Sequence, residues 1–237
     1  VTLQEKIFPI VLSGDHSSAL GTISGVKAAF SNKRIGVVWI DAHADIHSPY
    51  TSPSGNIHGM PLAAALSEDN LDFQINEIDR ETSDLWERMK NIATPGVKVL
   101  SEDVVYFGVR DTEEPEEKQI ENLNIKNYSV SEIRYKGLKK CVDEALLKLN
   151  DCDYIYISFD VDSMDCDMVS YGTGTPVQKG FDQVEVTQIM NQIIESKKVV
   201  CVEFVEVNPL LDFKGNKMAE TAFDILDDIT KTVSNSL

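Results

Sequence analysis

Six apolar runs rich in β-branched and aromatic residues recur along the chain, and they predict the strands of a sheet. The runs span residues 8–12, 34–40, 103–109, 126–130, 154–159 and 198–207. Several of them are apolar throughout and do not alternate with polar residues, which is typical of parallel strands covered on both faces. The pattern therefore predicts a sheet that is buried on both sides.

Segments with apolar residues at helical spacing separate these runs, and they predict helices. They span residues 17–30, 60–66, 113–123, 138–149, 182–196 and 218–233. Because strands and helices alternate, we expect an α/β fold with one mostly parallel sheet. Residues 67–97 are acidic and irregular, and we expect a surface excursion there. Neither a repeat nor a linker is evident, so we expect a single domain over residues 1–237.

Composition and charge exclude some classes of partner. The chain has 237 residues, of which 42% are hydrophobic, and its formal net charge is −17. A nucleic-acid surface would need a basic stripe, so we expect no nucleic-acid partner. No apolar run approaches the ~20 residues of a membrane span, so we expect no membrane partner.

The cysteines bear on the cellular compartment of the protein, and the first residues bear on its N-terminus. The cysteines are scattered and form no disulfide-like framework, which favours reduced thiols in a cytoplasm. They are Cys141, Cys152, Cys166 and Cys201. The first residues resemble no signal peptide and include no initiator Met, and the first apolar run begins almost at once. We therefore expect that a natural N-terminal segment precedes Val1.

The apolar run 34–40 leads directly into Asp41, His43 and Asp45. In a strand, residues at alternate positions point to the same side. Two carboxylates on one side repel each other unless something positive lies between them. Carboxylates and imidazoles are also ligands for divalent metals. The alternative is a polar loop in which an Asp caps the next helix.

Other predicted strands end in the same kind of residue. Asp160 and Asp162 follow one run, Glu206 ends another, and His16 follows the first. In open α/β sheets the ligand site lies outside the carboxyl ends of the strands. One such residue is usually a turn former or a helix cap, but four strand ends of this kind favour a site. All four histidines also fall within residues 16–58.

The motifs "SGDHS", "DAHAD", "SGNIHG", "SFDVDSMD", "GTGTP" and "EVNP", in this order, resemble the arginase branch of the ureohydrolases, a family of binuclear manganese amidinohydrolases. The resemblance runs from about Leu12 to the C-terminus. It implies a three-layer α/β/α fold around a mostly parallel sheet. It also implies about one further strand and helix before the first motif, in line with the expected N-terminal segment.

By this resemblance, two Mn²⁺ ions bind per chain. One ion would be held by His16, Asp41, Asp45 and Asp160, and the other by Asp41, His43, Asp160 and Asp162. The two shared aspartates would bridge the ions. Four carboxylates and two imidazoles form an oxygen-rich set that suits Mn²⁺ better than Zn²⁺. Two ions ~3.5–4 Å apart can share one water and lower its pKa.

The resemblance also implies two catalytic residues. Glu206 would hold the planar guanidinium of the substrate, whose N–H groups need a carboxylate. His58 would carry the proton that the leaving amine gains. The alternatives are a turn former beside Asn208 for Glu206 and a loop histidine bonded to backbone for His58. Thr175 matches a hydroxyl near the metal-site carboxylates.

The pocket for the amino-acid end of the substrate departs from the family pattern. His47 stands where the family commonly has an Asn that meets the α-carboxylate, and Ser52 and Ser54 match hydroxyls for the same group. For the α-amino group, the motif "GVRDTEE" gives Asp111, and it places Glu113 where the family has a second Asp. A donor at His47 still favours arginine.

We therefore expect an arginase that hydrolyses L-arginine to L-ornithine and urea. The resemblance also implies a homo-oligomer, a trimer or a hexamer, and the cysteines favour a cytoplasmic location. One alternative is agmatinase or another guanidino hydrolase, but agmatine has no carboxylate for His47, Ser52 and Ser54. A second alternative is a metal-binding or arginine-binding protein without turnover.

Overall fold

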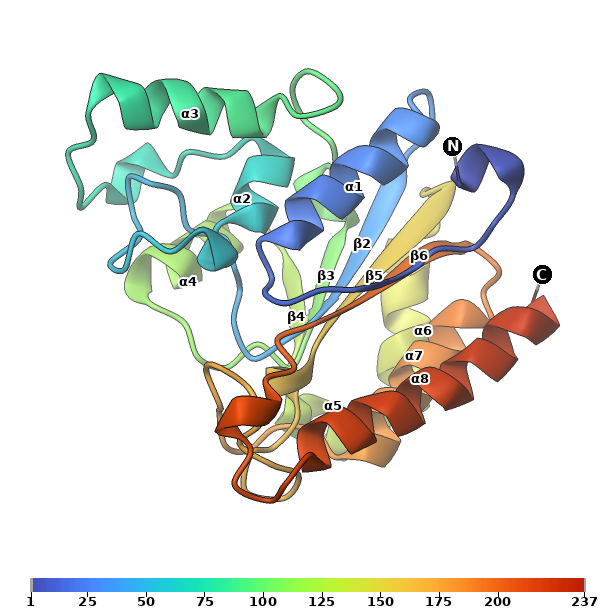
Figure 1. The fold of residues 1–237 in the computed structure, drawn as a ribbon. Coiled ribbons are helices and arrows are strands. Elements are labelled where there is room, and N and C mark those ends of the chain that lie inside the picture. Colours follow the sequence, from blue (N-terminus) through green and yellow to red (C-terminus); the bar gives the residue numbers. More distant parts are fainter. Residues whose placement is uncertain (1, 237) are drawn as a thin grey trace.

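A six-stranded parallel sheet forms the centre of the molecule in the computed structural model, which describes residues 2–236 (Figure 1). The strands are β1 (Ile10–Leu12), β2 (Ile35–Ile40), β3 (Val104–Phe107), β4 (Lys126–Tyr128), β5 (Tyr154–Asp160) and β6 (Val199–Val205). Their order across the sheet is β1-β6-β5-β2-β3-β4, and every neighbouring pair is parallel. Each predicted apolar run overlaps one of these strands.

Helices cover both faces of the sheet and complete three layers (Figure 1). They are α1 (Ser18–Ala29), α2 (Pro61–Leu66), α3 (Arg80–Lys90), α4 (Glu114–Asn122), α5 (Val130–Lys136), α6 (Leu138–Lys148), α7 (Gln183–Ile194) and α8 (Lys217–Ser236). Short 3₁₀ helices lie at Leu3–Glu5, Ile57–Gly59, Leu71–Phe73, Ser101–Asp103, Val161–Ser163 and Pro209–Leu211. The helices α5 to α8 pack on one face, and α1, α2 and α4 pack on the other, with α3 outside α2. The predicted three-layer α/β/α fold is confirmed.

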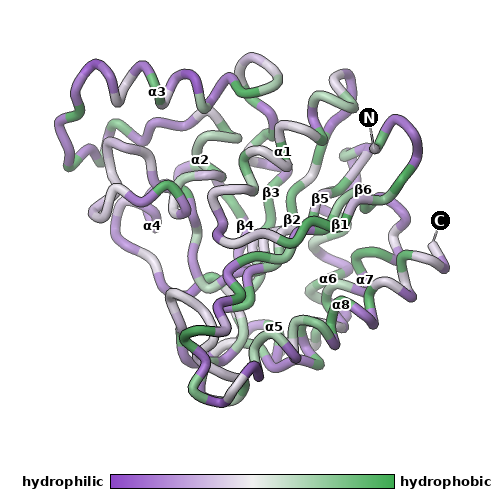
Figure 2. Tube along the Cα trace, in the orientation of Figure 1, coloured by the Kyte–Doolittle hydropathy of each residue, from purple (hydrophilic) through white to green (hydrophobic). Residues whose placement is uncertain are grey.

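The side chains of β2 show why these runs are apolar throughout. Val38 and Ile40 join the core under α5 to α8, whereas Val37 and Trp39 join the core under α1 and α2. Both sets are fully buried. Figure 2 shows the same contrast, with hydrophobic strands inside and a largely hydrophilic α3 outside. A strand buried on both faces has no polar side, so alternation is lost.

Two local predictions were wrong. Residues 67–97, expected to be irregular, contain α3, which begins after Asp79 because this side chain accepts a hydrogen bond from the backbone of Thr82. The run 126–130 leaves the sheet at Tyr128, because Ser129 caps α5 in the same way. Side-chain capping of the first turn outweighs weak apolar patterning in both places.

Because all six strands are parallel, their carboxyl ends meet at one edge of the sheet. The segments that follow β1, β2, β5 and β6 lie at this edge, and they carry the predicted site residues. Among residues 2–236, no helix is both long and apolar enough to cross a membrane.

Candidate metal centre

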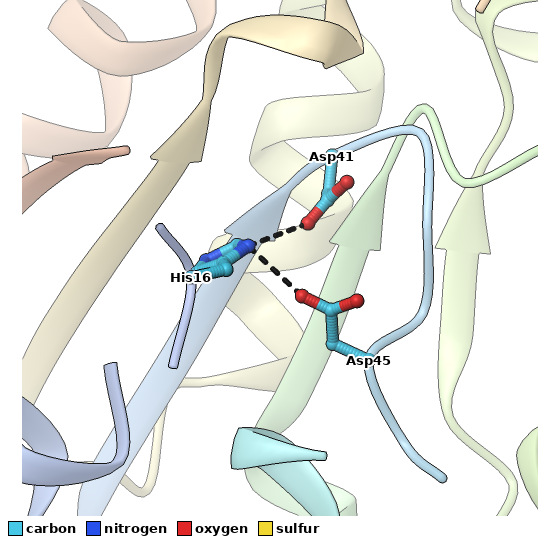
Figure 3. Close-up of side chains that lie close together, drawn as sticks. All are labelled: His16, Asp41 and Asp45. Atoms are coloured by element: carbon cyan, nitrogen blue, oxygen red, sulfur yellow. Dashed lines mark ion pairs between the residues drawn. The ribbon is translucent and has the colours of Figure 1, made fainter. Parts of the chain in front are cut away.

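The imidazole of His16 lies at the centre of a group of carboxylates. Its Nδ1 atom is 2.9 Å from an oxygen of Asp41, 2.9 Å from an oxygen of Asp45 and 3.3 Å from an oxygen of Asp160. Figure 3 shows the first two carboxylates pointing at the ring from the segment after β2. All four side chains are buried. The structure thus brings together the four residues expected to hold one ion.

A second group adjoins the first. The Nδ1 atom of His43 is 3.0 Å from an oxygen of Asp162 and 3.5 Å from an oxygen of Asp41. These three residues offer ligand atoms within 4.8 Å of one another, as do His16, Asp41 and Asp45. Asp41 therefore belongs to both groups, which agrees with the bridging place expected for it.

The local backbone differs from the expected strand alternation. β2 ends at Ile40, so Asp41, His43 and Asp45 lie in the loop beyond it. The carboxylate of Asp45 reaches His16 because its own backbone is left-handed, with φ of 51°. Glu206 is also left-handed, with φ of 68°. Such backbone is costly for residues other than glycine and tends to cluster at functional sites.

Backbone and side-chain donors orient the carboxylates. Asp41 accepts from the N–H of His43 at 2.7 Å and from the indole N–H of Trp39 at 2.9 Å. Asp160 accepts from the N–H of Asp162 at 2.8 Å. These hydrogen bonds fix the orientation of both carboxylates, which therefore point at the two imidazoles.

The protein environment makes these carboxylates hard to charge together. Burial, followed by repulsion from Asp41, raises the pKa of Asp45 to about 6. Burial and the neighbouring carboxylates of Asp162 and Asp41 raise the pKa of Asp160 well above its usual range. Burial also opposes charge on Asp41, but the adjoining imidazoles of His16 and His43 lower its pKa overall. Positive charge placed among these groups would relieve the repulsion.

The donor set fits a divalent cation. The Nδ1 atom of His16 is buried and, within residues 2–236, has no hydrogen-bond partner of good geometry, although two carboxylate oxygens lie at 2.9 Å. Unpaired buried polar atoms are rare and need an explanation, and an ion is one. A ring nitrogen facing several carboxylates matches the ligands of metals that prefer oxygen and imidazole.

A cavity of about 360 Å³ opens over the two groups. The predicted catalytic residues Glu206 and His58 line it, and their closest atoms, Oε1 and Nδ1, are 3.7 Å apart. The same Oε1 atom accepts a hydrogen bond from the backbone N–H of His16 at 3.0 Å. Burial is the largest influence on Glu206 and raises its pKa. Its carboxylate is thus fixed beside the candidate metal centre.

The predicted substrate-binding residues also line this cavity. They are His47, Ser52, Ser54, Asp111, Glu113 and Thr175. Thr175 donates a hydrogen bond of 2.9 Å to Asp162, so it contacts a predicted metal ligand. Asp111 lies 3.6 Å from the Nε2 atom of His43. Their roles in binding substrate remain predictions.

His47 has a partner that the sequence did not indicate. Its Nε2 atom lies 3.0 Å from an oxygen of Glu113, and Glu116 lies 3.5 Å away. The ring is buried, so this contact is part of the cavity wall. The residue expected to meet the substrate's α-carboxylate therefore also contacts the residue expected to meet its α-amino group.

Sequence reasoning missed several residues that support the site. Ser158 lies 2.7 Å from the Nε2 atom of His16, and the ring of Trp39 stacks on the same imidazole. Arg110 donates to carbonyls that include those of Gly108 and Asp162. The available signal was position, since Trp39 and Ser158 each precede a predicted metal ligand by two residues in a strand.

The fold and this donor set define an α/β protein with clusters at the carboxyl edge of its sheet that can bind metal. The chain belongs to the arginase family, whose model matches residues 2–231.

Individual relatives agree with this assignment. Arginase from Bacillus subtilis is 37% identical over 227 residues, which is 96% of this chain and 70% of the relative. The crystal structure of arginase from Bacillus subtilis has a TM-score of 0.82, covering 96% of this chain and 71% of that one at 37% identity. Arginase from Helicobacter pylori has a TM-score of 0.85 at 31% identity, covering 98% and 76%. The structure of Entamoeba histolytica arginase in complex with L-ornithine has a TM-score of 0.81 at 31% identity, covering 97% and 72%.

Proposed function

We propose that this chain is a manganese-dependent arginase that hydrolyses L-arginine to L-ornithine and urea. The observation that carries the proposal is the convergence of six candidate ligands beneath a cavity that also holds Glu206 and His58. A relative in the same family was crystallised with L-ornithine, the amino-acid product of this reaction.

Two cations would be held by the six residues named above. The set of four carboxylates and two imidazoles favours Mn²⁺ over metals that prefer sulfur. When bound, a pair of such ions supplies an activated water and a positive field at the reacting carbon. The donors to Asp41 and Asp160 keep these carboxylates aimed at the centre.

Glu206 would bind the guanidinium. This group is planar and carries N–H donors along its edges, so a fixed carboxylate can hold it in one orientation. The N–H of His16 fixes Oε1 of Glu206, which leaves the other carboxylate oxygen for the substrate. The substrate's carbon is thereby placed over the metal ligands.

His58 would supply the proton that the reaction requires. Cleavage breaks the bond between the guanidinium carbon and the chain nitrogen, and this nitrogen must gain a proton to leave as an amine. The side chain of His58 is 36% exposed, so its ring can exchange protons with solvent while it faces the cavity. Its place beside Glu206 brings it near the group that leaves.

At the other end of the cavity, the hydroxyls of Ser52 and Ser54 would donate hydrogen bonds to the α-carboxylate, and Asp111 and Glu113 would face the α-ammonium. The contact with Glu113 engages His47, the residue expected to meet the α-carboxylate. Because agmatine lacks this carboxylate, it stays as a second candidate substrate.

The test is urea release by the manganese-loaded chain from a panel of arginine, agmatine and other guanidino compounds. We expect arginine to be the best substrate. Glu206→Gln should lower kcat/KM by at least tenfold, because an amide offers one acceptor where the cationic group needs a carboxylate. Two bound Mn²⁺ ions without urea release from any compound would favour a binding protein.

We also propose that residues 1–237 form one catalytic domain and that the chain acts in the cytoplasm as a homo-oligomer, a trimer or a hexamer. Large apolar side chains exposed at Leu210, Phe213 and Phe223 support an association surface. Light scattering on the manganese-loaded protein gives the oligomeric state directly. A monomer at micromolar concentration would contradict the proposal.

A further inference from the structure

A chain of buried polar groups extends from His16 away from the cavity. The Nδ1 atom of the ring faces the candidate metal centre, and the opposite nitrogen, Nε2, lies 2.7 Å from the hydroxyl of Ser158 on β5. Both residues are buried. Because Ser158 is the partner of Nε2, the direction of this hydrogen bond decides which ring nitrogen carries a proton.

The next group is the phenol of Tyr156, two residues earlier on the same side of β5. Its side chain is on the same face of the sheet as that of Ser158. Its own hydroxyl donates to the Oε2 atom of Glu203 at 2.6 Å. Burial, followed by the neighbouring Glu203, raises the pKa of Tyr156 well above its ordinary value, so this phenol keeps its proton.

Glu203 is the last group in the chain and is fully buried, with 0% of its surface exposed. It lies on β6 in an otherwise apolar strand. Besides Tyr156, it accepts a hydrogen bond of 2.6 Å from the hydroxyl of Ser18, the first residue of α1. Ser18 follows His16 by two residues, so both contacts of Glu203 lead back to the same imidazole.

A carboxylate can only accept hydrogen bonds, and this sets the direction of every hydrogen bond between Glu203 and His16. Tyr156 donates to Glu203, so its oxygen is free to accept from Ser158. Ser158 then accepts from the Nε2–H of His16. The lone pair of His16 is thereby left on Nδ1, the nitrogen that faces Asp41 and Asp45.

From this geometry we infer that Glu203 is a positioning residue for the candidate metal centre. It holds the proton of His16 on Nε2 and anchors the segment that carries His16, so that Nδ1 is available to a cation. The inference rests on the proposed function in one respect, namely that a cation binds at His16. It assigns Glu203 no contact with substrate.

A glutamate that serves only the stability of the core is the alternative, and metal binding distinguishes the two roles. In Glu203→Gln the amide donates to one of the two hydroxyls, which permits the series of hydrogen bonds to reverse and places a proton on Nδ1 of His16. Tyr156→Phe breaks this series at its middle. Residues that orient a metal-binding histidine typically contribute about 10–100-fold to affinity.

The experiment measures the number and the affinity of Mn²⁺ ions bound to the full chain, from the electron paramagnetic resonance signal of the free ion. We expect two ions on the unchanged protein. In Glu203→Gln and in Tyr156→Phe, one of the two should bind at least tenfold more weakly, and the other should change by less than threefold. This readout does not depend on turnover.

Two variants serve as matched controls. Asp103→Asn alters another buried carboxylate, which pairs with Arg34 beside the amino end of β3. Tyr128→Phe removes another buried phenol of the same sheet, on β4. Both should lower thermal stability without changing either manganese affinity.

A double variant tests whether Glu203 acts through His16. Once His16→Ala has removed the ring, Glu203→Gln should have no further effect on manganese binding. Unchanged affinity in both Glu203→Gln and Tyr156→Phe would overturn the inference and leave the proposed function standing. Absence of manganese binding in the unchanged protein would instead overturn the proposed function, and the inference with it.

Discussion

At the scale of single residues, both ring nitrogens of His47 have polar partners within the cavity wall. The backbone N–H of Ser48 donates to the hydroxyl of Thr51, which lies 3.0 Å from the Nδ1 atom of His47. The Nε2 atom lies 3.0 Å from Glu113. His47 therefore joins Thr51 to Glu113 and restrains a carboxylate of the pocket.

His47→Asn should keep arginine hydrolysis within about tenfold, because one side-chain hydrogen-bond donor replaces another worth ~0.5–1.5 kcal/mol. His47→Ala should raise KM for arginine more than it lowers kcat, since Glu113 loses its restraint in the ground and transition states alike. Steady-state kinetics with arginine measure both effects.

Agmatine is the comparison substrate for these variants, because it lacks the α-carboxylate but keeps the ammonium group that Glu113 would face. Since His47 acts here through Glu113, His47→Ala should raise KM for agmatine as well. If His47→Ala abolished kcat and manganese loading while KM stayed constant, His47 would belong to the metal centre.

At the scale of elements, the turn after β3 depends on Gly108. Its φ is 91°, and a Cβ atom there would lie 2.6 Å from the ring of Phe181 and 3.3 Å from the carbonyl oxygen of Asp41. The glycine thus permits close packing of the β3 end against the segment that carries the metal ligands.

Gly108→Ala should lower the free energy of unfolding by about 1–3 kcal/mol, the cost of a left-handed backbone in a residue with a side chain. Urea denaturation measures it. The matched control is Gly25→Ala in α1, where a Cβ atom meets nothing within 4 Å. Because glycine weakens a helix, that change should raise stability by about 0.4–1 kcal/mol. Equal effects of the two substitutions would contradict this account of Gly108.

Elements with strong periodicity could be predicted from the sequence, and the others could not. All six strands and six helices follow from apolar patterning. In α3, by contrast, only Trp86 and Lys90 are buried, so its helix carries little apolar signal. A polar helix on the outside of α2 is stabilised by capping and by local contacts, which are harder to recognise in a sequence.

The candidate site also has a part that could be predicted from the sequence and a part that could not. The six candidate ligands follow from motifs, because each lies at the carboxyl end of a strand or within a few residues of it. The left-handed backbone of Asp45 and Glu206 depends on how the loops pack, and no local pattern indicates it. The contacts of His47 with Glu113 and of Glu203 with Tyr156 join residues 66 and 47 positions apart. A single sequence does not show such pairs.

At the scale of the whole molecule, the buried carboxyls couple stability to pH. A carboxyl whose pKa is raised on folding contributes stability that is complete below its unfolded pKa and is lost as the pH rises through its folded pKa. For Asp45 this window runs from 3.8 to about 6, and for Glu116 from 4.5 to about 9. The metal-free protein should therefore become less stable as the pH rises.

A cation replaces the proton of a ligand such as Asp45, so metal affinity should rise with pH. Binding to the folded state raises stability by mass action. We therefore expect a fixed concentration of Mn²⁺ to raise Tm more at pH 8 than at pH 5.5. Differential scanning calorimetry with and without the ion provides the comparison, and a shift of equal size at both pH values would contradict the role assigned to these carboxyls.

The stacking of Trp39 on His16 has an optical consequence. The two rings are 4.0 Å apart and nearly parallel, and the indole N–H donates to Asp41, so this chromophore contacts two of the candidate ligands. The chain has only one other tryptophan, Trp86. A paramagnetic ion beside an indole quenches its fluorescence. In Trp86→Phe, emission would come from Trp39 alone and should fall as Mn²⁺ is added, so the protein carries its own unlabelled reporter of metal occupancy.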